Sequence, residues 1–157
     1  MYGYLTGSYV RDKDGVDGAY MICEMFSYYA TKGISLLDKL DELYKTYGYC
    51  LNTLHSYEFD GSAGFAKMQS IMQAFRGDIK EFGGKKVIKL LDYAPGLDGL
   101  PKSDVLKFLL EDNCSIVVRP SGTEPKLKTY ISVSAENKAA AEKVEVEICK
   151  SAEEYLK

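Results

Sequence analysis

The sequence predicts an α+β fold, with helices on one side of an antiparallel four-stranded sheet and two further helices before it. Two observations lead to this prediction. From residue 49 onward, most β-forming segments follow one another with connections short enough for hairpins. Amphipathic helical patterns precede the first of these segments, follow it and close the chain. Hairpin-length connections imply antiparallel pairing, with the helices packed on one face of the sheet.

Two helices are expected before the sheet. Apolar residues recur at helical spacing over residues 16–32, and Asp14 is a suitable N-cap for that segment. Ser35 and Asp38 have the spacing of a weakened capping box, which would open a second helix that ends at Gly48. We expect the tyrosines on these two helices to contribute core and rim packing rather than a platform for a ligand.

The remainder of the chain alternates between β-forming and helical patterns. The strand candidates are 49–59, 86–93, 105–111, 115–118 and 126–133, and the helix candidates are 62–75 and 137–157. Because segment 105–111 is short and rich in leucine, it is either a strand or one helical turn. The glycines of segment 77–84 do not have the spacing of a nucleotide-binding loop, so this stretch is interpreted as a turn before a strand.

Composition and charge limit the classes of partner. The chain has 157 residues, of which 46% are hydrophobic and 27% charged, as in ordinary globular proteins. The net charge of −3 argues against a general binder of nucleic acid or of membrane surfaces. No apolar run approaches the roughly 20 residues of a membrane span, and the first residues do not resemble a secretory signal.

The cysteines indicate a reducing compartment. Cys23, Cys50, Cys114 and Cys149 are widely spaced, and the chain has one histidine, His55, so the usual zinc-binding spacings are absent. Most of the cysteines stand among apolar residues and are expected to be buried free thiols. His55 has no cysteine or acidic residue near it in sequence and is interpreted as a surface or strand histidine. We therefore expect a cytoplasmic protein.

The most informative segment is the run RPSGTEPKLK at residues 119–128, which lies between two predicted strands. It combines a guanidinium, two hydroxyls, a glycine with an accessible N–H group and a lysine, which together are the groups that a phosphate dianion needs. Pro120 and Pro125 limit the conformations of the turn and lower the entropy cost of ordering it. Such a concentration of donors is unusual for a plain hairpin turn.

This run resembles the phosphate-binding loop in the last domain of the α-D-phosphohexomutases, the phosphoglucomutases and phosphomannomutases. The resemblance implies that the sheet and its helices form that domain, which has a TATA-box-binding-protein-like fold. Glu124 is expected to orient Arg119 or a lysine rather than to contact an anion. By the same resemblance, the substrate phosphate that is not being transferred would be bound by Arg119, Ser121, Gly122, Thr123 and Lys128.

Residues 2–16 resemble the end of the preceding domain in the same family. By this resemblance, residues 1–48 are the end of the third, sugar-binding domain and residues 49–157 are the fourth, phosphate-binding domain. Lys13 would lie near the reacting oxygens, where an ammonium group could stabilise developing charge or assist proton transfer. Met1 stands where an acidic sugar-reading loop should end, so we expect the chain to be the C-terminal piece of a longer enzyme.

The resemblance also implies a reaction. The parent enzyme would interconvert hexose 1-phosphate and hexose 6-phosphate through a phosphoserine and a bisphosphorylated sugar. Its essential magnesium would be held by an Asp-x-Asp-x-Asp run in a domain that this chain lacks, so no metal or cofactor is expected here. The expected partners are the phosphosugar and the missing N-terminal domains, and the piece alone should be inactive. Two alternatives remain open, namely a stand-alone anion-binding regulatory module and a structural or interaction domain with a charged hairpin.

Overall fold

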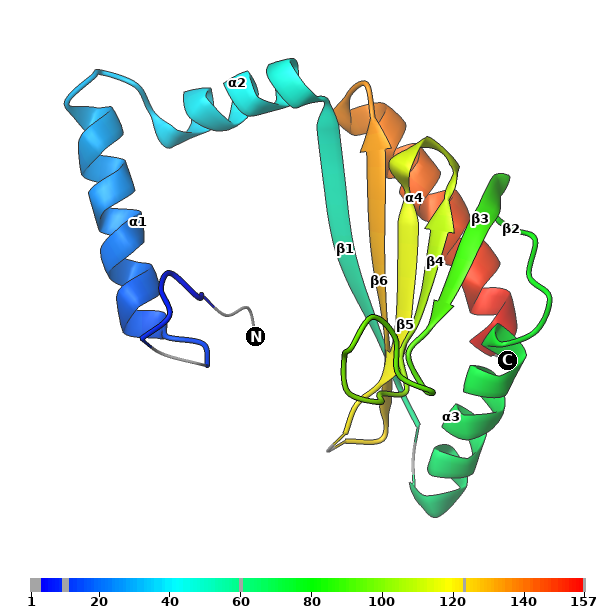
Figure 1. Cartoon of the computed structure of the whole chain (residues 1–157). Helices are drawn as coiled ribbons and strands as arrows, with labels where there is room; N and C mark the ends of the chain where they lie inside the picture. Colours follow the sequence, from blue (N-terminus) through cyan, green and yellow to red (C-terminus); the bar gives the residue numbers. More distant parts are fainter. Residues whose placement is uncertain (1–3, 10–11, 60, 123, 157) are drawn as a thin grey trace. The chain divides into compact units, whose positions relative to one another are not determined.

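A computed structural model describes residues 4–9, 12–59, 61–122 and 124–156 of the chain (Figure 1). The chain divides into two compact units, Met1–Tyr47 and Gly48–Lys157, which are described separately below. Over the described residues, no helix combines the length and the apolar character needed to cross a membrane.

The first unit contains two helices, α1 (Gly15–Ala30) and α2 (Leu36–Tyr47). The Asp14 carboxylate accepts hydrogen bonds from the N–H groups of the first turn of α1, which confirms it as the N-cap. The capping box is also confirmed, because the Asp38 N–H donates to Ser35 Oγ at 3.0 Å and the Ser35 N–H donates to the Asp38 carboxylate at 3.3 Å.

The apolar faces of α1 and α2 have little protein packed against them. Gly18 is the one buried residue of the two helices. Tyr20 is 66% exposed and Tyr47 is 81% exposed, so the expectation that the tyrosines of these helices form core packing is wrong for these two residues. The periodicity correctly marked an apolar helical face, but the first unit contains no sheet or third helix, among its described residues, to cover it.

The second unit is built on one antiparallel sheet of six strands in the order β1-β6-β5-β4-β3-β2. Thus the α+β class is confirmed, and the expected number of four strands is wrong. The leucine-rich segment is a strand rather than a helical turn, with alternate residues buried. The strands are β1 (Tyr49–Glu58), β2 (Glu81–Phe82), β3 (Lys85–Asp92), β4 (Leu106–Leu110), β5 (Ser115–Pro120) and β6 (Lys126–Ala135).

The predicted turn before β3 is confirmed, and the additional strand β2 exists because this turn is tight enough to close a hairpin. Gly83 and Gly84 both have positive φ, and this two-residue turn pairs Phe82 with Lys85. Phe82 is fully buried, so the short strand adds an aromatic side chain to the core. A second tight connection joins β4 to β5 through a 3₁₀ turn at Glu111–Asn113.

Two helices pack on one face of the sheet, α3 (Gly61–Phe75) and α4 (Lys138–Glu153), and α4 continues into a 3₁₀ turn at Glu154–Leu156. Figure 1 shows α4 running along the sheet. Side chains from both helices join one core with the alternate buried residues of the central strands. Phe75, Phe82 and Phe108 form its aromatic centre, with the rings of Phe82 and Phe108 5.0 Å apart in an edge-to-face arrangement.

The cysteines differ in exposure. Cys114 is buried and Cys149 is half-buried, whereas Cys23 and Cys50 are exposed. The expectation of mostly buried thiols is therefore wrong for the latter two. Cys23 lies on the uncovered helix α1, and Cys50 is on the face of β1 opposite to the core.

Arg76 ties the end of α3 to the sheet. Its Nε donates to the Asp92 carboxylate at 2.9 Å, and its guanidinium donates to Asp104 at 2.6 Å. Asp92 ends β3, and Asp104 precedes β4. The planar Arg76 guanidinium therefore connects three segments of the second unit, namely the end of α3, the end of β3 and the segment before β4.

The two turn glycines make a matched pair of stability tests. A Cβ at residue 83 would lie 2.5 Å from the backbone of Glu147 and Ile148 in α4, whereas a Cβ at residue 84 meets nothing within 4 Å. Gly84→Ala should therefore cost about 1–2 kcal/mol of unfolding free energy, from positive φ alone. Gly83→Ala should cost a further ~1–3 kcal/mol because α4 must shift. Denaturant unfolding measures both, and equal losses would contradict this packing.

The Asp92 ion pair should give a defined pH dependence. The hydrogen bond from Arg76 lowers the pKa of Asp92 from its ordinary value of 3.8. Its stabilisation is therefore complete above that value and is lost as the pH falls through the lower folded-state pKa. Asp92→Asn should cost about 1 kcal/mol at neutral pH, and the two stability curves should converge in acid.

The control for this prediction is Asp78→Asn, since Asp78 pairs with Lys80 and both side chains are largely exposed. This substitution should change the unfolding free energy by less than about 0.5 kcal/mol. A difference between the native chain and Asp92→Asn that stays constant down to pH ~2 would show that the ion pair does not stabilise the fold.

Candidate phosphate-binding site

The run at residues 119–128 forms the hairpin connection between β5 and β6. The Ser121 N–H donates to the Lys126 carbonyl at 2.7 Å, and the Lys126 N–H donates to the Glu124 carbonyl at 2.7 Å. The Phe59 N–H donates to the Pro125 carbonyl at 2.9 Å, which fastens the loop to the end of β1. These bonds hold the entrance and the exit of the loop, as expected for a site that is ordered before its ligand arrives.

Two cations face each other where the strands meet the loop. Arg119 of β5 is the register partner of Lys128 of β6. Their neighbours Val118 and Thr129 are also partners and are buried on the helix-covered side. Because side chains alternate along a strand, Arg119 and Lys128 extend from the open face of the sheet. Directly opposed residues have Cβ atoms roughly 5 Å apart, so like charges there repel one another.

The nearby carboxylates do not neutralise this pair. Lys126 binds Glu58 at 3.1 Å and Glu124 at 3.6 Å, which confirms that Glu124 orients a lysine. In the part of the chain that the structure describes, neither Arg119 nor Lys128 makes an ion pair or a side-chain hydrogen bond. The acidic charge at the loop is thus directed toward Lys126, and the opposed cations are left for an external anion.

A hollow of ≈ 270 Å³ adjoins the loop and is lined by Phe65, Ser121, Gly122, Glu124 and Pro125. A Cβ at residue 122 would meet no atom within 4 Å, so the glycine backbone is open to a ligand. The Ser121 hydroxyl can serve a ligand, but its N–H already closes the loop. Thr123, the remaining predicted phosphate contact in the loop, lies outside the described residues.

Two residues at this site were not identified from the sequence. Ser56 of β1 is the register partner of Lys128, so its exposed hydroxyl extends from the same face of the sheet. Phe65 of α3 supplies the apolar wall of the hollow and is 60% exposed. No local motif marks either residue. The pairing of β1 with β6 and the packing of α3 beside the loop bring them there.

Lys13, the predicted catalytic residue, is described within its own unit. It lies in the first unit, before α1, and its ammonium is 3.3 Å from the carboxylate of Asp12. Both side chains are more than half exposed. The Lys13 N–H also donates to that carboxylate, and this bond lowers the pKa of Asp12.

A second hollow, of ≈ 460 Å³, lies beside Arg76 and Lys102. Arg76 is an unsuitable ligand for an anion, because its guanidinium already binds Asp92 and Asp104. These two carboxylates would also repel an anion at that position. The opposed pair Arg119 and Lys128 is therefore the better candidate for an anion site.

The chain is similar in sequence to known proteins. Residues 60–151 match the family model described as the C-terminal domain of phosphoglucomutase/phosphomannomutase. A phosphoglucomutase of Staphylococcus aureus strain MSSA476 is 38% identical over 148 residues, covering 87% of this chain and 27% of that protein. For a phosphoglucomutase of Staphylococcus saprophyticus the identity is 33%, with the same coverage.

A solved structure supports the fold. Parafusin, a phosphoglucomutase from Paramecium in an open form, matches with a TM-score of 0.60 at 18% identity, over 94% of this chain and 27% of that chain. The chain thus spans about 27% of the length of the curated relatives it matches. From the matched model and these relatives, the chain belongs to the phosphoglucomutase/phosphomannomutase family, and residues 60–151 are its C-terminal domain.

Proposed function

We propose that this chain is the phosphate-binding C-terminal portion of a phosphohexomutase. The observation that carries the proposal is the opposed pair Arg119 and Lys128, which has no acidic partner among the described residues. Arg119 would give a bidentate contact to the phosphate, and Lys128 a point charge. Ser121 and Thr123 would add hydroxyl donors, and Gly122 a backbone N–H.

The physical reason is the cost of leaving two cations side by side. Their repulsion lowers the unfolding free energy of the ligand-free protein. A dianion between them would replace this repulsion with two charge-assisted contacts. Each such contact is worth roughly 1.5–3 kcal/mol net, against which the entropy of association must be set. Binding of inorganic phosphate on the order of millimolar is therefore expected for a single clamp.

The parent reaction that we propose interconverts hexose 1-phosphate and hexose 6-phosphate. A phosphoserine in another domain would donate its phosphoryl group, and the resulting bisphosphorylated sugar would turn around before returning the other phosphate. The C-terminal domain must then bind a phosphate at either end of the sugar. A clamp made of Arg119, Lys128 and hydroxyl donors recognises charge and ignores the ring, which suits both orientations.

The first unit fits this proposal as the end of the preceding, sugar-binding domain. Its uncovered apolar residues, such as Val16 and Leu37, would pack against the remainder of that domain. Lys13 would then lie near the reacting oxygens. The phosphoserine and the magnesium ion would belong to other domains, so the chain alone should not convert one hexose phosphate into the other. Like other enzymes of phosphorylated sugars, the parent is expected in the cytoplasm.

Phosphate binding can be measured by an NMR titration of the full chain with inorganic phosphate. The Gly122 amide should shift and saturate with a Kd of ~1 mM. The Ser121 amide should move less, because its hydrogen already binds the Lys126 carbonyl. If phosphate up to about 50 mM moves Gly122 no more than chloride at equal ionic strength does, the loop is not a preformed clamp.

Arg119→Ala should weaken phosphate binding by about tenfold or more, because it removes one charge-assisted contact. Lys107→Ala is the matched control. Lys107 is on β4, its register partner is Val117, and it extends from the same open face as Arg119. The control should bind phosphate like the native chain. An equal loss in both variants would mean that the face attracts anions generally, without a clamp at the loop.

The like-charge pair should also be visible in stability. In low-salt buffer without phosphate, Lys128→Gln should raise the unfolding free energy by about 0.2–1 kcal/mol, because it relieves repulsion from Arg119. About 20 mM phosphate should stabilise the native chain by about 1.8 kcal/mol if its Kd is ~1 mM, and should stabilise Lys128→Gln much less. Thermal or denaturant unfolding at matched ionic strength measures both effects. Destabilisation by Lys128→Gln in the absence of phosphate would contradict the repulsion.

A further inference from the structure

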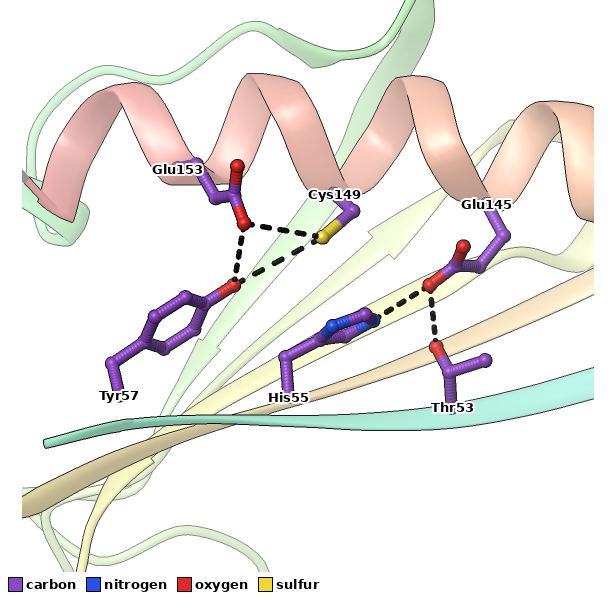
Figure 2. A network of polar contacts seen from close by, with 6 residues as sticks. All are labelled: Thr53, His55, Tyr57, Glu145, Cys149 and Glu153. Carbon is purple, nitrogen blue, oxygen red and sulfur yellow. Dashed lines mark hydrogen bonds and ion pairs between the residues drawn. The ribbon is translucent and has the colours of Figure 1, made fainter.

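A second group of chemically active side chains lies on the helix-covered face of the sheet, where α4 crosses β1. Thr53, His55 and Tyr57 alternate along β1 toward the helix, and Glu145, Cys149 and Glu153 recur every four residues along α4. Figure 2 shows the two rows pointing toward each other across the seam. None of these residues contributes to the phosphate site proposed above.

Three potential metal ligands meet in this group. His55 Nε2 is 2.7 Å from Glu145 Oε1, and the ligand atoms of His55, Glu145 and Cys149 all lie within 4.8 Å of one another. We refer to these three residues as the seam triad. The Thr53 hydroxyl donates to the same Glu145 oxygen at 2.7 Å, and so fixes the carboxylate toward the imidazole. Tyr57 donates to Glu153 at 3.3 Å beside the thiol.

Glu145 is the buried residue of the seam, whereas Glu153 is exposed. The Glu145 side chain is 10% exposed and the His55 side chain 32%. Over the described residues, no lysine or arginine pairs with Glu145 or Glu153, and His55 is the one basic group that contacts Glu145. A buried carboxylate without a fixed cation is costly unless a proton or a cation compensates it.

A buried hydroxyl lies on the same face of the sheet as His55. Thr129 is 1% exposed, and its hydroxyl is the one fully buried side-chain polar atom of the described residues that lacks a hydrogen-bond partner. It is the register partner of His55, and therefore extends from the same face of the sheet. Buried polar atoms without a partner are rare, and either a water or a small rotation toward the Tyr57 hydroxyl would satisfy this one.

We propose that the seam triad binds one divalent transition-metal ion of the zinc type, through His55 Nε2, a Glu145 carboxylate oxygen and the Cys149 thiolate. The ion takes the position of the proton that lies between Nε2 and the carboxylate, and this proton moves through solvent to Nδ1. The imidazole stays neutral with its proton on Nδ1, and the thiol releases its proton to solvent. The carboxylate and the thiolate then balance the charge of the ion, and a water takes the fourth position.

The donor set selects the class of metal. A nitrogen, a sulfur and an oxygen donor suit zinc and its neighbours, whereas calcium and magnesium prefer oxygen donors alone. Thr53 is the positioning residue, since its hydroxyl holds the carboxylate at the triad. A thiol that coordinates such a metal is deprotonated, so binding at Cys149 releases one proton.

The test uses the full chain with reduced thiols and Co²⁺ alone as the probe. One cobalt per chain should bind and produce a thiolate-to-cobalt charge-transfer band together with the intense visible bands of a tetrahedral site. His55→Gln and Cys149→Ser should each weaken binding by more than ~100-fold, and Thr53→Val by about 10–100-fold. Because His55 is the only histidine of the chain, a loss in His55→Gln assigns the nitrogen ligand.

The matched control is Cys50→Ser. Cys50 is on the same strand as His55 but on the open face, where it is exposed, so this variant should keep the band and the affinity. Absence of the band in the native chain would overturn the proposal. The proposal would equally fail if the band survived unchanged in Cys149→Ser or disappeared in Cys50→Ser.

A measurement on the native chain avoids any dependence on folding of the variants. Zn²⁺ should protect Cys149 from alkylation by iodoacetamide, read by mass spectrometry, while Cys23 and Cys50 react at unchanged rates. Equal alkylation of Cys149 with and without Zn²⁺ would exclude a zinc–thiolate bond. Both experiments are independent of phosphate, so their outcome does not bear on the function proposed for residues 119–128.

Discussion

In the pairing of β5 with β6, Ile116 lies opposite Ile131 and Val118 opposite Thr129, so the helix-covered face of these strands is specified residue by residue. A slip of one residue would turn this buried set toward solvent and bring Arg119 or Lys128 into the core. Burial of the apolar side chains therefore holds two cations side by side that would otherwise separate. The stability of the core thus maintains an arrangement of charges that is unfavourable at the surface.

Most of the second unit could be predicted because its signals are local. The alternation in segments 49–58 and 126–135, the N-cap at Asn137 and the bracketing prolines at the loop all act within a few residues. The loop itself was recognisable because consecutive residues carry its donors. Arg119 and Lys128 were assigned individually, but their direct opposition follows only from the register of the two strands.

Features that depend on distant contacts were missed. The strand at residues 81–82 has no β pattern of its own and exists because Gly83 and Gly84 fold it back onto β3. His55 was interpreted as isolated, although its partner Glu145 is 90 residues away in sequence and 2.7 Å away in space. Tyr20 and Tyr47 are exposed for a different reason, since helical periodicity marks an apolar face but does not determine whether another element packs on it.

The position of β1 has a consequence for how the unit acquires its shape. In the described sheet, β1 lies at the edge and pairs with β6 alone. The hydrogen bonds between these strands, which place Tyr49 opposite Ala135, can form only after residue 135 has been synthesised. During synthesis at the ribosome, this first strand leaves the exit tunnel long before its neighbour exists. Pairing over such a sequence separation is slow, because the whole intervening chain must be closed into a loop. An emerging β1 therefore offers unsatisfied backbone groups to chaperones, or to the same segment on another nascent chain.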